Sequence, residues 1–235
     1  VISRALADYA LTRSPAADVL LAPAMAAAVE DGGAQGPRPA SPYARFLYAG
    51  AFSEKKDGVD SLIKAFARVV AARPDARLDL YGHASAARLA ELRDIIGAAG
   101  LSERVAVRPP VPQAAIAGLL TQADALVLCR PYSKQAEGGF STKLVEYLAS
   151  GRPVVATLTG DKGRYLEDGV SAFLAPANDV PAFADRMLAA IDDTGHAEQV
   201  GRRGRDIFVR YFDADGVSDR IWDWLHRPPT PGFKP

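Results

Sequence analysis

The strongest candidate for binding chemistry is a glycine pair, Gly138-Gly139, followed by a short amphipathic helix predicted over 142–150. Free backbone N–H groups at a helix start bind anions, and glycines before them let a phosphate approach the backbone. Ser141 or Thr142 can instead cap the helix and satisfy the same donors internally. The pattern therefore indicates either a phosphate site or an ordinary capped helix.

Two charged residues share the polar face of this predicted helix. Glu146 lies one turn inside it, where a carboxylate can accept two hydroxyl groups of a sugar, as acidic residues do for ribose in dinucleotide-binding folds. Lys143 can neutralise a phosphate as a point charge. The alternative is a solvated Lys143–Glu146 pair at i, i+3 spacing, which stabilises a helix by only about 0.2–0.5 kcal/mol.

The elements that position this helix alternate between strand and helix. We expect strands at 45–49, 77–81, 105–108, 125–129, 153–157 and 172–175, helices at 59–72, 86–99, 112–122 and 142–150, and a helix-rich region at about 180–225. Such alternation predicts an α/β fold, a Rossmann-like parallel sheet with helices on both faces. Right-handed crossovers then bring the loops 50–58, 82–85, 130–141 and 158–163 to one sheet edge, where ligands bind.

The two ends of the chain read differently from this core. We expect a helix over 3–12 and a short strand over 18–21. Residues 31–42 are rich in Gly and Pro and predict a linker. The last eight residues, 228–235, predict a frayed proline-rich tail.

Composition limits the possible functions. The chain has 235 residues with 28 basic and 28 acidic side chains, so its net charge of zero favours no nucleic-acid partner. Cys129 is the one cysteine, which excludes an internal disulfide and suggests a reducing compartment. No apolar run reaches the length that spans a bilayer. Because the sequence starts at Val1, we expect a piece of a longer protein.

The remaining reactive residues point to no metal and no protein nucleophile. His83, His196 and His226 lack metal-ligand spacing, so no metal site is predicted. His83 follows a strand end and can face the cleft. Cys129 ends a buried strand and is expected to pack there, and Asp161 is expected in a turn.

Four stretches in register carry a family resemblance. The sequence Gly-Phe-Ser-Thr-Lys-Leu-Val-Glu-Tyr-Leu-Ala-Ser-Gly-Arg-Pro-Val-Val at 139–155 resembles the donor-site signature of the group 1 glycosyltransferases (glycosyltransferase family 4). The stretches 48–66, 80–83 and 123–128 resemble the family's first strand and phosphate loop, its second strand and turn, and the strand entering the donor loop. The resemblance covers about residues 43–212.

The resemblance implies a GT-B fold of two Rossmann-like domains. In this family the C-terminal domain binds a nucleotide-diphosphate sugar and the N-terminal domain binds the acceptor. Transfer retains the anomeric configuration, usually without an essential metal. Residues 1–30 then correspond to the end of the N-terminal domain and the crossover, 43–212 to the donor domain, and 213–235 to a C-terminal helix and tail.

The family's Glu-x7-Glu motif is only partly present. Glu146 matches the second Glu and is expected to bind the ribose, whereas the first falls on Gly138. Glu137 is one residue out of register and is the candidate for the sugar, with Gly139 and Phe140 offering backbone N–H groups.

The phosphate loop also departs from the family pattern. After Gly50 the expected Arg is Ala51, while Lys56 keeps the Lys position. Arg130 and Lys143 are the candidates for replacing the missing cation. We therefore expect Lys56, Arg130 and the helix start with Ser141 and Thr142 to hold the leaving diphosphate.

These residues predict the donor domain of a retaining glycosyltransferase. No further cofactor is expected, since the nucleotide-diphosphate sugar is the donor substrate. The acceptor would be a saccharide or a lipid-linked molecule, in cell-surface polysaccharide or glycolipid synthesis, in the cytoplasm or at the inner face of the membrane. A non-catalytic nucleotide-sugar-binding module stays open. A dinucleotide-binding oxidoreductase is disfavoured, because Gly50-Ala51-Phe52-Ser53 does not begin a Gly-x-Gly-x-x-Gly motif.

Overall fold

A computed structural model describes residues 1–28 and 43–227 of the chain. The predicted linker at 31–42 and the tail at 228–235 lie outside the described residues. The strands are β1 (Arg45–Ala51), β2 (Arg77–His83), β3 (Val105–Arg108), β4 (Ala125–Leu128), β5 (Val154–Leu158) and β6 (Phe173–Pro176). The helices are α1 (Arg4–Arg13), α2 (Glu54–Asp57), α3 (Val59–Ala72), α4 (Ala86–Ala98), α5 (Gln113–Leu120), α6 (Lys134–Gly138), α7 (Thr142–Ala149), α8 (Lys162–Tyr165), α9 (Val180–Asp192), α10 (Thr194–Tyr211) and α11 (Ala214–His226).

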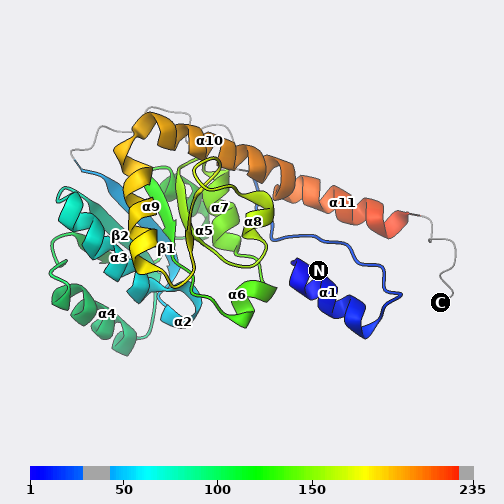
Figure 1. Cartoon of the computed structure of the whole chain (residues 1–235), viewed down its shortest axis with the longest axis horizontal. Coiled ribbons are helices and arrows are strands. Elements are labelled where there is room, and N and C mark those ends of the chain that lie inside the picture. The colour runs from blue at the N-terminus through cyan, green and yellow to red at the C-terminus, as the bar shows by residue number, and fades with distance from the viewer. Residues whose placement is uncertain (29–42, 228–235) are drawn as a thin grey trace.

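All six strands form one parallel sheet in the order β3-β2-β1-β4-β5-β6. The order reverses direction between β1 and β4, so right-handed crossovers place the connecting helices of the two halves on opposite faces. Helices α3 and α9 pack together on one face, and α7 packs against α10 (Figure 1). The predicted Rossmann-like α/β fold is confirmed.

A crevice opens where the sheet changes direction. Strands β1 and β4 pair only through Phe46 with Ala125 and Leu47 with Leu126. Further along, the Tyr147 hydroxyl of α7 takes the place of a strand partner: it accepts a hydrogen bond from the Ala49 amide at 2.8 Å. Tyr147 is buried in the second half of α7 and joins this helix to the carboxyl-terminal half of β1. Ligands of doubly wound sheets bind in such a crevice.

The amphipathic elements were predicted closely and the short ones were missed. Helix 59–72 and strand 105–108 have the predicted bounds. Helices α2, α6 and α8 span four or five residues each, too few to show a helical period in the sequence.

The predicted strand at 18–21 is wrong. This segment joins none of the strands of the sheet, and the backbone groups of Leu20 and Ala22 bond instead to Val1. The chain then runs to the α10–α11 junction, where Ala26 bridges Asp213. Helix α1 lies beside α6, apart from the sheet (Figure 1).

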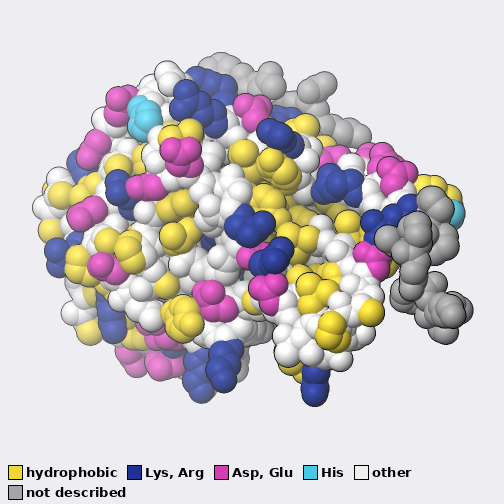
Figure 2. Space-filling view, turned by 45° about the vertical axis from the view of Figure 1, so that its right-hand side comes forward, with side chains coloured by type: hydrophobic (Ala, Val, Ile, Leu, Met, Phe, Trp, Pro, Cys, Tyr) yellow, Lys and Arg dark blue, Asp and Glu magenta, His cyan; other side chains and the backbone are white. Residues whose placement is uncertain are grey.

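The surface carries charges of both signs. Basic and acidic side chains are interspersed over the face seen in Figure 2, in keeping with the zero net charge. Within residues 1–28 and 43–227, no helix combines the length and the apolar character needed to cross a membrane.

Candidate functional site

A pocket of about 550 Å³ lies at the carboxyl edge of the sheet, between the loop after β1, the segment from β4 to α7, and α1. Four cationic side chains and one carboxylate line it, together with the loop before α7. The lining residues are Ile2, Leu6, Lys56, Asp57, Arg130, Lys134, Gln135, Gly138, Gly139, Phe140, Ser141, Thr142 and Lys143. Seven of the eleven residues predicted for the site are among them.

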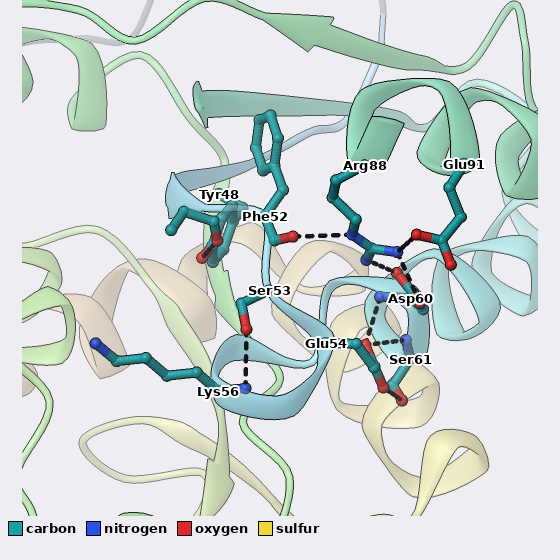
Figure 3. A network of polar contacts seen from close by, with 10 residues as sticks. Tyr48, Phe52, Ser53, Glu54, Lys56, Asp60, Ser61, Arg88 and Glu91 are labelled. Atoms are coloured by element: carbon teal, nitrogen blue, oxygen red, sulfur yellow. Dashed lines mark hydrogen bonds and ion pairs between the residues drawn. The ribbon is translucent and has the colours of Figure 1, made fainter. Parts of the chain in front are cut away.

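The loop after β1 is held from behind by its own hydrogen bonds (Figure 3). The Glu54 carboxylate accepts bonds from the Asp60 amide at 2.7 Å and the Ser61 amide at 3.3 Å, so the start of α3 is satisfied internally. Arg88 of α4 donates to the Phe52 carbonyl at 3.0 Å and pairs with Asp60. These bonds make the loop a fixed structural part of the sheet edge.

The same loop presents Lys56 to the pocket. The Ser53 hydroxyl caps α2 by accepting from the Lys56 amide at 3.2 Å. The Lys56 side chain extends away from the network of Glu54 and Arg88 (Figure 3). Its ammonium is exposed and available to a ligand.

Arg130 follows the buried strand β4 and lies at the base of the pocket. The residue is 6% exposed, and its Nε donates to the Lys56 carbonyl at 3.2 Å. The guanidinium therefore joins the two loops on either side of the crevice. An arginine held in this way offers its remaining N–H groups with a fixed orientation.

Lys143 forms an ion pair that the sequence did not predict. Its Nζ lies 2.5 Å from Oδ1 of Asp57, a residue that is only 2% exposed. The lysine stem crosses Gly50 so closely that a Cβ there would come within 2.1 Å of Lys143 Cε. Gly50 is thus required for this contact, and the alternative pairing of Lys143 with Glu146 is wrong.

The start of α7 is only partly capped. Ser141 has an extended backbone, and its hydroxyl accepts from the Leu144 amide at 3.5 Å. In the described part of the chain no acceptor meets the amides of Thr142 and Lys143, the first two residues of the helix. These N–H groups and the helix dipole give the pocket a positive wall.

Aromatic packing supports the loop before α7. Phe140 lies against Phe212 with ring centroids 5.1 Å apart and against Tyr165 at 5.7 Å. The ring packs into the C-terminal helices, while the loop backbone at Gly139 and Phe140 borders the pocket.

Three predicted residues lie outside the pocket lining besides Gly50. Glu146 is half-buried on α7, with Oε1 at 3.3 Å from Nε2 of Gln113. Glu137 is half-buried and accepts from the Gly160 amide at 3.1 Å. His83 ends β2 with an exposed side chain. The roles of Glu146, Glu137 and His83 toward a donor stay predictions.

Sequence reasoning missed several residues that the fold brings to the site. Lys134 and the apolar Ile2 and Leu6 line the pocket, and the Ser3 hydroxyl donates to the Gly138 carbonyl at 2.7 Å. Asp57 also lines the pocket, and its position between Lys56 and Gly58 is the sequence signal for an acidic residue in this turn.

Two buried titratable groups lie behind the site. Burial raises the pKa of the Cys129 thiol to about 12, which agrees with its predicted packing role. Lys162 was not predicted for the site and is 3% exposed. Burial is the larger cause, and the charge of Arg130 the smaller one, that lowers the pKa of its amine to about 7.

Known proteins are similar to this chain in sequence. Residues 43–193 match the family described as glycosyl transferases group 1. A D-inositol 3-phosphate glycosyltransferase of Arthrobacter sp. (strain FB24) is 34% identical over 158 residues, which are 66% of this chain and 36% of that protein. A phosphatidyl-myo-inositol mannosyltransferase of Mycobacterium leprae (strain TN) is 30% identical over 190 residues, 80% of this chain and 48% of that protein. The chain thus spans less than half the length of these two relatives.

A solved structure shows the same fold. Alr3699/HepE of Anabaena, in complex with UDP and glucose, superposes with a TM-score of 0.69 at 24% identity, over 79% of this chain and 49% of that one. The family match covers the sheet, the loop after β1 and the start of α7 together. The chain belongs to the group 1 glycosyltransferases.

Proposed function

We propose that the chain is the donor-binding part of a retaining glycosyltransferase that takes its sugar from a nucleotide diphosphate. The observation that carries the proposal is the pocket at the β1/β4 crevice, where Lys56, Arg130 and Lys143 converge with the open start of α7. With Lys134 the pocket lining has four cationic residues against one carboxylate. Such a site attracts a diphosphate, which carries two or more negative charges at neutral pH.

Each predicted residue has a place in this proposal. Lys56 and Arg130 contact the phosphates from the two sides of the crevice, and the amides from Gly139 to Lys143 bind the oxygens that face α7. Lys143 shares its charge between Asp57 and the phosphate. Gly50 is needed for the close approach of the lysine stem.

The two carboxylates take the sugar hydroxyls. Glu146 lies one turn along α7, and ribose hydroxyls would replace its bond to Gln113. Glu137, beside the pocket, takes the place of the family's first Glu for the transferred sugar, and His83 borders the nucleotide from the end of β2.

The chemistry asked of these residues is stabilisation of a leaving group. The bond between the anomeric carbon and the β-phosphate oxygen breaks, and the phosphate keeps the electron pair. An acceptor hydroxyl bonds to the same face of that carbon and its proton passes to the departing phosphate. Cations and amides held before the reaction lower the energy of the developing charge without reorganisation.

The acceptor side belongs to a further domain in this proposal. Relatives of the chain are named D-inositol 3-phosphate glycosyltransferase and phosphatidyl-myo-inositol mannosyltransferase, and these names support a saccharide or lipid-linked acceptor. We place the enzyme in cell-surface polysaccharide or glycolipid synthesis, in the cytoplasm or peripherally at the inner face of the membrane. An isolated donor domain would bind donor weakly and transfer little.

A nucleotide panel tests the donor site. We expect millimolar UDP, GDP or ADP, or one of their sugars, to raise the midpoint of thermal unfolding, since a ligand that binds only the folded state stabilises it by RT ln(1 + [L]/Kd). Glu146→Ala should reduce the shift, and Glu198→Ala, which removes an exposed carboxylate from α10, is the matched control. If no nucleotide raised the midpoint of thermal unfolding, the proposed donor site would be refuted.

The same panel separates an enzyme from a non-catalytic binding module. The full-length enzyme should hydrolyse or transfer the sugar of the nucleotide that stabilises the chain. Binding without hydrolysis or transfer of any donor would support the module instead.

A further inference from the structure

One buried lysine lies directly behind the pocket without lining it. Lys162 is the first residue of α8 and is 3% exposed. Its Nζ donates to the carbonyl of Thr157 at 2.7 Å and to the hydroxyl of Thr159 at 2.8 Å. Both threonines are buried, so the amine holds the turn after β5 from the inside.

The turn that Lys162 holds is bonded to two residues of the proposed donor site. The Thr157 hydroxyl donates to the carbonyl of Arg130 at 2.6 Å. The Gly160 amide donates to the Glu137 carboxylate at 3.1 Å. Lys162 therefore supports the arginine of the pocket through Thr157, and the Glu137 carboxylate through the Thr159-Gly160 turn.

The charges that face Lys162 oppose one another. Burial is the main cause that lowers the pKa of its amine to about 7, and the positive Arg130 lowers it further, whereas Glu137 raises it. Cys129 also faces the amine, but the pKa of its thiol is about 12, so it is neutral in the relevant range. Asp161, on the same element, accepts from the Arg4 amide.

The hydrogen bonds fit an uncharged amine. A neutral lysine has two N–H donors, and the two threonine oxygens use both. A third proton would need a further acceptor, and none is found among the described residues. Both donors of the neutral amine are thus used, and the geometry is complete for that form.

On the basis of the proposed donor site, we propose that Lys162 is a positioning residue for it, neutral in the empty site at pH 8, and that it takes up a proton from solvent when a nucleoside diphosphate binds beside Arg130. The phosphate charge offsets that of the arginine and so favours the ammonium form. By linkage, donor affinity then falls as the pH rises above neutrality, because an extra proton must be bound. A lysine that only braced the turn would produce neither effect.

Calorimetric titration of the chain with UDP at pH 8, in buffers of different ionisation enthalpy, measures this proton directly. The second phosphate pKa is about 6, so UDP itself is fully ionised at pH 8 and adds no proton change. We expect roughly 0.5–1 proton taken up per UDP at pH 8 and far less at pH 6, where the amine is already charged.

Two variants assign the proton to Lys162. Lys162→Met keeps an unbranched apolar stem, removes the amine and should abolish the uptake, leaving the affinity for UDP independent of pH between 7 and 9. Arg164→Met removes an exposed cation from the same helix and should keep both effects. If Lys162→Met fails to fold, the ε-carbon resonances of the wild-type lysines decide: one lysine should titrate near neutral pH and become charged with UDP.

The outcomes separate this inference from the proposed function. UDP binding without proton uptake, or with uptake retained in Lys162→Met, overturns the role of Lys162 and leaves the donor site standing. Failure of every nucleotide to bind overturns the donor site, and the role of Lys162 with it.

Discussion

The two helix starts that face the β1/β4 crevice differ in how their amides are satisfied. At α3 the Glu54 carboxylate accepts from the Asp60 and Ser61 amides. At α7 the Ser141 hydroxyl reaches only the Leu144 amide and leaves the two preceding amides to the pocket. The loop after β1, which carries the phosphate site in many dinucleotide-binding folds, is closed by its own carboxylate here.

The buried charges differ in the same way. On the α3 side, Arg88 pairs with Asp60 and Glu91. On the α7 side, Lys162 is bonded only to threonine oxygens, and Lys143 has one carboxylate partner, Asp57. The start of α3 is therefore satisfied by its own loop, whereas the start of α7 leaves two amides to a ligand.

The largest expected effect follows from breaking the Lys143–Asp57 pair. Lys143→Met leaves a buried carboxylate without its counter-charge, which should cost about 3–5 kcal/mol in the free energy of unfolding. The double variant Asp57→Asn/Lys143→Met should regain most of that stability in urea denaturation. Both variants should bind UDP more weakly than the wild type does. A double variant with wild-type affinity for UDP would show that Lys143 serves the fold alone.

The second expected effect is a pH dependence of the free energy of unfolding that originates at Lys162, on the α7 side of the crevice. The amine of Lys162 has a pKa of about 7 in the folded chain and about 10.4 when unfolded. Unfolding therefore takes up a proton between these values, so the free energy of unfolding should rise with pH there, by up to about 1.4 kcal/mol per pH unit. Below pH 7 Lys162 is protonated in both the folded and the unfolded chain, so its contribution to the free energy of unfolding no longer changes with pH.

Comparison with variants isolates this slope from other titrations. Lys162→Met should lack the rise between pH 7 and pH 10, and Arg88→Met should keep it. Parallel stability curves for the wild type and Lys162→Met would contradict the buried-amine interpretation.

A smaller effect is expected from removing one amide at the α7 start. Thr142 is the first helical residue, where proline is tolerated, and the extended backbone of Ser141 suits a following proline. Thr142→Pro should leave stability nearly unchanged and weaken UDP binding roughly tenfold, by the loss of one charge-assisted hydrogen bond. Unchanged UDP affinity in calorimetry would mean that this amide does not bind phosphate.

The smallest effect on UDP binding is expected from the corresponding change at the start of α3. Glu54→Ala removes the acceptor for two helix-start amides and should lower the free energy of unfolding by about 1 kcal/mol. UDP affinity should stay within a factor of two, because this carboxylate faces away from the pocket. A large loss of affinity at full stability would make the two helix starts functionally alike.

The sequence predicted the fold because the signals were local. The apolar spacing of Leu62, Ile63, Phe66, Val69 and Val70 marks one face of α3, and the run Ala125–Leu128 marks a fully buried strand. Strand–helix alternation then determined the sheet edge at which seven of the predicted site residues meet. The position of the pocket followed from topology.

The missed features depend on contacts between distant residues. Asp57 and Lys143 are 86 residues apart, so the local Glu146 appeared to be the partner. A lysine in the polar turn at 160–163 is expected to be solvated, and only the packing of α8 under the crevice shows that Lys162 is buried. The strand predicted at 18–21 failed because β-pairing needs a neighbour that no local pattern supplies.

A titration of the ¹⁵N-labelled chain with UDP, followed by amide resonances, tests the central difference most directly. We predict that the amides of Gly139 to Lys143 shift strongly on binding, while those of Asp60 and Ser61 stay in place under the Glu54 carboxylate. Strong shifts at Asp60 and Ser61, with the Thr142 and Lys143 resonances unchanged, would instead place the diphosphate on the loop after β1.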